Sequence, residues 1–332
     1  MGEGCPGGAS APPRIARGQT LGIVAPAGPV RLESLRRGLD RLGGAFRLKL
    51  APSLGGARDD GAPSYIAPPR EPGIPSYLAA SDDMRAAELN AMLADRDVRA
   101  ILLARGGYGL MRILPRLDVA ALRADPKPIV GFSDATALLA WAYSAGVRGI
   151  HGPMGVQMER LSDGDIAHLV ALLTDPRAPG IRPWPLVAHG RGVYRGPLIA
   201  ANLTMMSVLA GTPWALSIRG AIGLVEEVGE RPYELDRYLT HLVLAGELSK
   251  IAAMIVGDLT RCDDAAPPLG TPDPPDAALA TVLERLHAAG TPAATGAPIG
   301  HGDRNEAIPF GATSVLDLDQ GTLDITEGAV SA

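Results

Sequence analysis

The sequence predicts an α/β fold in two domains, the first of them built on a parallel sheet covered by helices. Before residue 150, short apolar runs alternate three times with segments of helical periodicity, the order that strand–helix–strand units produce. The chain has 332 residues, which is long for one compact core. A short helical stretch and a Pro-rich passage at residues 176–185 interrupt this pattern. We therefore expect a linker region at residues 156–195.

The first half of the chain supplies the alternating elements. Residues 20–26 (TLGIVAP) form a short apolar run that we interpret as a buried first strand. Residues 52–75 are dense in Gly and Pro and predict an irregular surface loop. Further strands are expected at residues 46–51, 99–104, 127–132 and 150–153, and helices at residues 32–42, 82–94 and 134–140.

The second half begins with an apolar run that ends at Ala200. Pro232 in a first turn, followed by leucines at helical spacing, predicts a helix at residues 232–244. Residues 262–275 predict a polar loop, and residues 314–318 and 322–326 predict a hairpin. Further helices are expected at residues 202–210 and 276–289, and strands at residues 221–225 and 251–256.

Composition excludes several classes of protein. A net charge of -5 and the lack of a basic stripe argue against binding to nucleic acid. No run of about 18 apolar residues is present, so we expect no membrane span. Cys5 and Cys262 are far apart, which predicts neither a disulfide framework nor a cysteine-based metal site. Residues 1–15 lack a secretion signal and are expected to be a disordered tail, so we expect a cytoplasmic protein.

The segment at residues 127–140 changes at once from a strand-like run to a helix-like run, and Ser133 lies at the turn. A serine on such a bend can present its hydroxyl as an acyl-transfer nucleophile. The alternative is helix capping, which Ser and Asp both favour. The Gly-x-Ser-x-Gly pattern is incomplete because Ala135 stands at its last position.

A glycine-rich turn at residues 105–109 (RGGYG) follows the preceding strand. Its backbone N–H groups could form an oxyanion hole together with the N–H of Asp134. The alternative is a plain tight turn. A nucleotide-binding loop is disfavoured because the sequence contains neither Gly-x-Gly-x-x-Gly nor Gly-Lys-Ser/Thr.

A nucleophilic serine needs a base and a group that orients the base. Of the six histidines, His151 and His301 lie in segments that favour function, while the others fall in helical or flexible stretches. Glu226 and Glu227 end a strand, where one carboxylate can face a cleft and the other the opposite side. The residues alone leave both choices open. No His-Glu-x-x-His or comparable ligand cluster is present, so we expect no metal.

Several segments together resemble the L,D-carboxypeptidases (muramoyltetrapeptide carboxypeptidases), a family that includes the microcin-immunity peptidases. They extend in the family's order from about residue 20 to residue 326. The matching segments are residues 77–97 (YLAASDDMRAAELNAMLADRD), 105–118 (RGGYGLMRILPRLD), 131–138 (GFSDATAL), 151–154 (HGPM), 202–203 (NL) with 211–213 (GTP), 226–239 (EEVGERPYELDRYL) and 300–311 (GHGDRNEAIPFG).

The resemblance implies a serine peptidase with a Ser-Glu-His triad, which corresponds here to Ser133, Glu226 and His301. His151 then belongs to the wall of the site. The family fold implies a flavodoxin-like N-terminal domain at residues 16–155 and a smaller, swivelling β/α C-terminal domain at residues 196–332. One departure is visible, because Ala200-Ala201 stands where the family usually carries Gly-Gly, and two methyl groups there could narrow a pocket.

The expected activity is therefore hydrolysis of the bond before the terminal D-alanine of peptidoglycan tetrapeptides, through an acyl-enzyme and without a cofactor. Backbone N–H groups of Gly107 and Asp134 are the expected oxyanion donors. Candidate substrate-binding residues are Arg105, Tyr108, His151 and Asn202. The resemblance also implies a homodimer that acts on muropeptides in murein recycling. The alternatives are a self-immunity peptidase that cleaves a peptidyl-nucleotide antibiotic and a non-catalytic muropeptide-binding protein.

Overall fold

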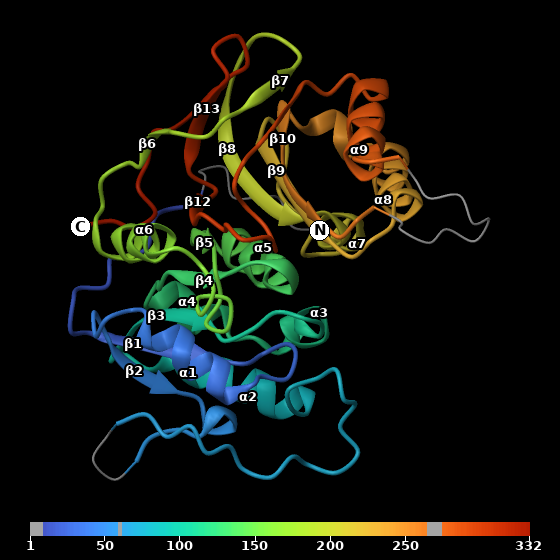
Figure 1. Cartoon of the computed structure of the whole chain (residues 1–332). Helices are drawn as coiled ribbons and strands as arrows, with labels where there is room; N and C mark the ends of the chain where they lie inside the picture. Colours follow the sequence, from blue (N-terminus) through green and yellow to red (C-terminus); the bar gives the residue numbers. More distant parts are fainter. Residues whose placement is uncertain (1–8, 59–61, 264–273) are drawn as a thin grey trace.

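The computed structural model describes residues 9–58, 62–263 and 274–332, which form two lobes, each around one β-sheet (Figure 1). The first sheet has six strands in the order β12-β5-β4-β3-β1-β2, and the second has eight in the order β6-β14-β13-β8-β9-β10-β11-β7. The predicted fold class is confirmed. The expected polar loop at residues 262–275 lies mostly outside the described residues.

The first sheet has five parallel strands, whose order 2-1-3-4-5 is that of flavodoxin-like folds. Helices cover both faces, because alternate residues of the strands belong to different apolar clusters: Ile101 and Leu103 to one, Ala100 and Leu102 to the other. The parallel strands are β1 (Thr20–Val24), β2 (Arg47–Leu50), β3 (Val98–Leu103), β4 (Ile129–Gly131) and β5 (Gly149–His151).

Helices α2 to α5 contribute to the apolar cluster on one face of this sheet, and α1 and α6 to the cluster on the other. A capping residue explains where α2 begins, since Ser81 Oγ accepts a hydrogen bond from Met84 N–H at 3.3 Å. The helices are α1 (Leu32–Asp40), α2 (Asp82–Ala94), α3 (Leu110–Ile113), α4 (Val119–Ala124), α5 (Thr136–Ser144) and α6 (Asp163–Thr174), with short 3₁₀ turns at Pro52–Leu54, Leu114–Arg116 and Ser133–Ala135.

The second sheet is parallel at its centre and antiparallel at its edges. The predicted hairpin is confirmed as β13 paired with β14. Its strands are β6 (Gly180–Arg182), β7 (Val187–His189), β8 (Val193–Asn202), β9 (Ile222–Val228), β10 (Ala253–Thr260), β11 (Ala293–Thr295), β13 (Thr313–Asp317) and β14 (Thr322–Ile325). The helices of this lobe are α7 (Leu203–Leu209), α8 (Pro232–Leu244) and α9 (Ala277–Ala288), with a 3₁₀ turn at Leu248–Lys250.

The chain crosses between the lobes more often than the sequence predicts. Strand β12 (Ile308–Phe310) comes from the second half of the chain but pairs antiparallel with β5, so it belongs to the first sheet. The expected start of a C-terminal domain at residue 196 therefore does not divide the chain cleanly. The expected linker at residues 156–195 also has its own structure, because α6 packs on the first sheet and β6 and β7 form opposite edges of the second.

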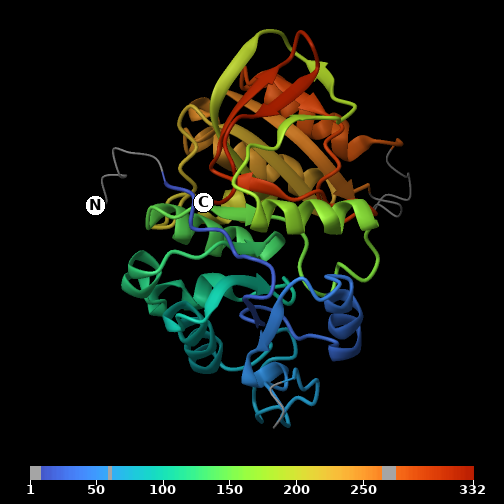
Figure 2. The same cartoon turned by 90° about the vertical axis from the view of Figure 1, so that its left-hand side faces the viewer.

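The segment at residues 9–15 is packed and is not part of a disordered tail. Ser10 N–H donates to Gly146 C=O at 3.0 Å, Arg14 N–H donates to Ser331 C=O at 3.0 Å, and Ile15 is fully buried. This segment passes beside the C-terminus (Figure 2). The rest of the expected tail, residues 1–8, lies outside the described residues.

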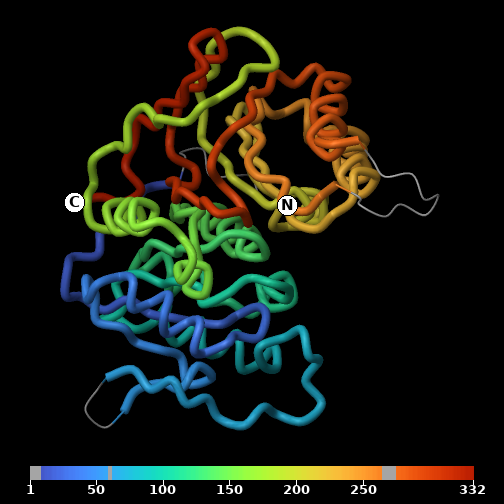
Figure 3. Tube along the Cα trace, viewed as in Figure 1, coloured from blue at the N-terminus to red at the C-terminus, as the bar shows by residue number. Residues whose placement is uncertain are grey.

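Residues 52–58 and 62–75, the described parts of the segment predicted to be irregular, lie at the end of the first lobe that is away from the second (Figure 3). Apart from the 3₁₀ turn at Pro52–Leu54, these described residues contain neither helix nor strand. Across the described residues, no helix combines the length and apolar character needed to cross a bilayer.

Helix α1 packs directly on the backbone that follows β5. A Cβ atom at Gly38 would lie 1.9 Å from the carbonyl oxygen of Gly155. We expect Gly38→Ala to lower the free energy of unfolding by about 1–3 kcal/mol, the usual cost of overpacking, as measured by chemical denaturation. Gly164→Ala in α6 is the control, since the nearest atom to its Cβ is Ser162 Oγ at 3.6 Å. Equal stability of the two variants would contradict this packing.

Candidate active site

Ser133 lies where β4 ends and turns into a helix, and its backbone is strained. Its φ is 62°, in the left-handed region that non-glycine residues rarely adopt. In the described chain only Arg261 and Asp276 share this property among non-glycine residues. Such strain costs about 1–3 kcal/mol and concentrates at functional sites. A strained strand-to-helix turn is also the geometry that exposes the hydroxyl of a nucleophilic serine.

The incomplete glycine pattern around Ser133 has a steric explanation. A Cβ atom at Gly131 would lie 2.7 Å from the Cβ of Ala135, so the turn brings these two positions together. One methyl group fits between them and two do not. The turn therefore needs a glycine at the first position but tolerates alanine at the second.

Helix capping does not explain Ser133 or Asp134. The 3₁₀ turn at Ser133–Ala135 has no side-chain cap, and within the described residues Ser133 Oγ forms no hydrogen bond. Asp134 instead accepts a hydrogen bond from Leu110 N–H at 2.9 Å, which ties the nucleophile turn to the start of α3. Burial raises the pKa of Asp134 to about 6. Neither residue therefore caps the helix that follows with its side chain.

The glycine-rich turn at residues 105–109 lies against Ser133. A Cβ atom at Gly106 would lie 3.3 Å from Ser133 Oγ, and Gly107 adopts a φ of 111°. In the described part of the chain, neither the N–H of Gly107 nor that of Asp134 has a hydrogen-bond acceptor. These two N–H groups, without acceptors among the described residues, lie on two turns that meet at Ser133, and an oxyanion hole is built from such donors.

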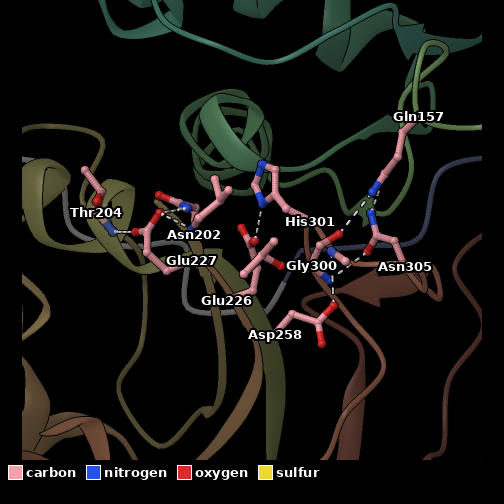
Figure 4. Close-up of polar contacts among 12 residues, drawn as sticks. Gln157, Asn202, Thr204, Glu226, Glu227, Asp258, Gly300, His301 and Asn305 are labelled. Carbon is pink, nitrogen blue, oxygen red and sulfur yellow. Dashed lines mark hydrogen bonds and ion pairs between the residues drawn. The ribbon is translucent and has the colours of Figure 1, made fainter. Parts of the chain in front are cut away.

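His301 pairs with Glu226, the first of the two glutamates in β9 (Figure 4). The distance from His301 Nδ1 to Glu226 Oε2 is 2.6 Å, and Glu226 is fully buried. Because a carboxylate only accepts, this bond places a proton on Nδ1 and leaves Nε2 outside the pair. The His301 ring also contacts Phe132, the residue before Ser133, with a centroid distance of 4.6 Å.

The structure therefore brings His301 to Glu226 and to the residue that precedes Ser133. In the part of the chain that the structure describes, no hydrogen bond joins Ser133 Oγ to His301. Nucleophile–base hydrogen bonds are often longer in enzymes without substrate and tighten when substrate is bound.

Glu227 faces the other side of β9 and has a structural role (Figure 4). Its carboxylate accepts hydrogen bonds from Asn202 Nδ2 at 2.7 Å, Val228 N–H at 2.8 Å and Thr204 N–H at 2.8 Å. Burial, and next the charge of Glu226, raise its pKa. Adjacent glutamates on one strand thus have separate partners, as alternation along a strand predicts.

Asn202, expected as a substrate-binding candidate, is already engaged inside the protein. Its side chain accepts from Met205 N–H at 3.1 Å as the N-cap of α7 and donates to Glu227. Ala200 and Ala201 precede it in β8, fully buried in different apolar clusters. Their methyl groups therefore fill the cores on the two faces of the sheet.

The remaining candidates lie around the turn. His151 is fully buried at the end of β5, edge-on to Phe132, and burial lowers its pKa to about 3, so it is neutral. Arg105 is exposed and donates from Nη1 to Pro29 C=O at 2.7 Å. Tyr108 is half-exposed against Tyr77, with ring centroids 5.7 Å apart.

Gln157 and Asp258, which support the loop that carries His301, have no signal in the sequence that predicts this role. Gln157 Nε2 donates to Gly300 C=O at 3.1 Å, and Asp258 accepts from Gly302 N–H at 3.2 Å (Figure 4). Burial raises the pKa of Asp258. A cavity of about 480 Å³ opens beside this loop, lined among others by Asp258, Thr260 and Gly302.

No group of three or more His, Cys, Asp or Glu side chains within the described ranges is placed to hold a metal ion. Cys262 is buried, and burial raises the pKa of its thiol to about 12. Cys5 lies outside the described residues.

Comparisons with known proteins find the same family in both halves of the chain. Residues 21–152 match the family model of the LD-carboxypeptidase N-terminal domain, and residues 195–316 match that of the C-terminal domain. A putative carboxypeptidase of Streptomyces coelicolor is 34% identical over 96% of this chain and 97% of its own length. The murein tetrapeptide carboxypeptidase of Pseudomonas aeruginosa is 33% identical over 72% of this chain and 79% of its own length.

Solved structures show the same similarity. The crystal structure of muramoyltetrapeptide carboxypeptidase from Oxalobacter formigenes has a TM-score of 0.76 and 26% identity, covering 94% of this chain and 100% of that one. The microcin C7 self-immunity protein MccF, in complex with aspartyl sulfamoyl adenosine, has a TM-score of 0.81 and 25% identity, covering 97% of this chain and 100% of that one.

The strain at Ser133 is measurable without substrate. We expect Ser133→Gly to be more stable than Ser133→Ala by about 1 kcal/mol, because glycine adopts a φ of 62° without steric cost and alanine does not. Both variants lack the hydroxyl, so the comparison isolates the backbone. The check is urea denaturation of the two proteins side by side. A Ser133→Ala protein of equal or greater stability would show that the turn is unstrained.

Proposed function

Because this chain belongs to the LD-carboxypeptidase family, we propose that it is a serine carboxypeptidase that releases the terminal D-alanine of peptidoglycan tetrapeptides. The observation that carries the proposal is the strained Ser133, with its unbonded hydroxyl beside Phe132 and the His301–Glu226 pair. The substrate is supported by similarity to enzymes named murein tetrapeptide carboxypeptidase and muramoyltetrapeptide carboxypeptidase.

In the proposed mechanism, His301 Nε2 takes the proton of Ser133 Oγ as the oxygen attacks the carbonyl carbon between an L-centre of the diamino acid and D-alanine. Glu226 holds the Nδ1–H and stabilises the imidazolium that forms. The tetrahedral intermediate collapses when the carbon–nitrogen bond breaks and His301 returns the proton to the leaving amine. Water then hydrolyses the acyl-enzyme by the same proton route and regenerates Ser133.

The negative oxygen of the tetrahedral intermediate needs donors that are already in place. The N–H groups of Gly107 and Asp134, which have no acceptor among the described residues, are the proposed donors. Each such donor contributes on the order of 10²–10³ to the rate in serine hydrolases. Since both belong to the backbone of tight turns, they need no reorganisation during the reaction.

A carboxypeptidase must also recognise the free carboxylate at the end of its substrate. Arg105 is the proposed partner, because this residue is exposed at the start of the glycine-rich turn. Its Nη1 donates to Pro29 C=O, and the guanidinium has further N–H groups that can bind a carboxylate. Tyr108 is exposed in the same turn and is proposed to contact the peptide. Murein recycling in the cytoplasm by a homodimer is part of this proposal.

A self-immunity peptidase is the second candidate. The microcin C7 self-immunity protein of Escherichia coli is 26% identical over 74% of this chain, and its complex with aspartyl sulfamoyl adenosine has a similar fold. The proposed residues would serve such a substrate equally, because it also requires attack of Ser133 on an acyl carbon.

D-alanine release from a purified murein tetrapeptide tests the substrate, with an aspartyl sulfamoyl adenosine conjugate as the competing substrate. We expect release by the wild-type protein and a fall on the order of 10⁴ or more in Ser133→Ala, since the nucleophile is lost. Turnover of the nucleotide conjugate alone would favour the self-immunity function. Binding of the tetrapeptide without turnover would favour a non-catalytic protein, and full activity of Ser133→Ala would eliminate the mechanism.

The two adjacent glutamates provide a matched test of the proposed triad. We expect Glu226→Gln to lower kcat by about 10³–10⁴, because the amide no longer holds the required tautomer of His301 or stabilises its charge. Glu227→Gln should change kcat less than about tenfold while it destabilises the protein by about 1–3 kcal/mol, since an NH₂ group would face a backbone N–H. Steady-state kinetics and thermal melts measure both. The opposite order of kcat values would exclude Glu226 as the orienting acid.

A further inference from the structure

His301 lies on a segment that has no regular structure to fix its position. Residues 296–307, between β11 and β12, contain neither helix nor strand. The bond to Glu226 holds the Nδ1 side of the imidazole but not the backbone that carries the ring. The described contacts must therefore hold the Gly300–His301 backbone in another way.

A closed set of three hydrogen bonds supplies this support (Figure 4). Gln157 Nε2 donates to Gly300 C=O at 3.1 Å, and Asn305 Oδ1 accepts from Gly300 N–H at 3.2 Å. Asn305 Nδ2 donates to Gln157 Oε1 at 2.8 Å. The N–H and C=O of Gly300 are thus both hydrogen-bonded, as are the oxygen and the nitrogen of each side-chain amide. These bonds restrict the orientation of the backbone just before His301.

Gln157 connects this support to the other half of the proposed site. The segment that carries it hydrogen-bonds to the end of β3, through Gly155 N–H to Leu103 C=O and Val156 N–H to Ala104 C=O, each at 3.0 Å. Residue 105 begins the glycine-rich turn directly after this strand end. The amide pair therefore fixes the histidine loop to the same strand end that leads into Gly107, one of the two proposed oxyanion donors.

Burial distinguishes these amides from the other contacts of the loop. Asn305 is fully buried and Gln157 is 6% exposed, whereas Arg160, which donates to His301 C=O at 2.9 Å, is exposed. Water competes for the exposed contact but not for the buried ones. Buried amides cost desolvation free energy, which only complete and well-oriented hydrogen bonding offsets.

We propose that Gln157 and Asn305 are positioning residues for the reaction, which hold the Gly300–His301 backbone where His301 meets both Glu226 and the Ser133 turn. This inference rests on the proposed function, because it assigns His301 the role of base. Neither amide contacts the reacting atoms. A shift of about 1 Å in a catalytic group can cost on the order of 10²-fold in rate, so the loss of this support should reduce kcat far more than KM.

The test is Gln157→Met, which keeps the length of the side chain and removes both hydrogen bonds. We expect kcat for D-alanine release to fall about 10²-fold with KM changed less than about threefold. Asn90→Leu is the control for the loss of a side-chain amide that bridges two segments. Its amide also makes two bonds between elements, to Arg116 C=O at 2.9 Å and from Asp118 N–H at 2.8 Å, away from His301. A structural role alone predicts a loss of stability and an unchanged kcat in both variants.

A second readout does not depend on substrate. The low-field proton resonance of His301 Nδ1–H, observed by NMR in the resting protein, should shift or broaden in Gln157→Met and stay unchanged in Asn90→Leu. If the wild-type protein releases no D-alanine, the proposed function fails, and this resonance still decides whether the amides position His301. A Gln157→Met protein with wild-type kcat and an unchanged resonance would overturn the inference.

Gln157→Asn keeps the test decisive if Gln157→Met does not fold. The shorter asparagine side chain moves the amide away from Gly300 and Asn305 but keeps a polar group at this position. We therefore expect a folded protein with a kcat between those of the wild type and Gln157→Met. A folded Gln157→Asn protein with wild-type kcat and an unchanged His301 resonance would also overturn the inference.

Discussion

The hydrogen bond between His301 Nδ1 and Glu226 Oε2 is the interaction on which the rest of the site depends. It joins a strand of the second sheet to an irregular loop, and the carboxylate that accepts it is fully buried. A buried carboxylate needs a partner, and a histidine base needs one fixed tautomer. The same bond fixes the tautomer and gives Oε2 its partner, while Oε1 of this carboxylate is buried without a hydrogen-bond partner among the described residues. The neighbouring Glu227 has three other donors, which keep it from competing for the imidazole.

The turn at Ser133 shows how the sequence accommodates strain. Its φ of 62° is tolerated because the surrounding residues leave little alternative: Gly131 and Ala135 approach so closely that only one side chain fits, and Asp134 is held by Leu110 N–H. The strained backbone at Ser133 lowers the free energy of unfolding, and burial of the surrounding apolar side chains offsets this cost. Apolar packing is continuous here, since one cluster includes Leu138 of α5 in the first lobe and Leu203 of α7 in the second.

Local signals predicted much of the fold. Helices α2 and α8 end where the sequence places them, because capping residues and helical periodicity act within a few residues. Strands β6, β7, β11 and β12 were missed, since three residues carry no usable period. In the site, Ser133 and His301 had local signals, and the residues alone could not separate Glu226 from Glu227. Gln157 had none, because its partner Asn305 is 148 positions away.

The return of β12 to the first sheet has a consequence for how the molecule could be divided. Strand β12 pairs with β5, and Ser331 near the C-terminus pairs with Pro13 near the N-terminus, so the first lobe is completed by the last part of the chain. A fragment that ends after β5 would expose an unpaired strand edge, a site for aggregation. The two lobes are therefore interdependent folding units, and the second must be synthesised before the first is complete.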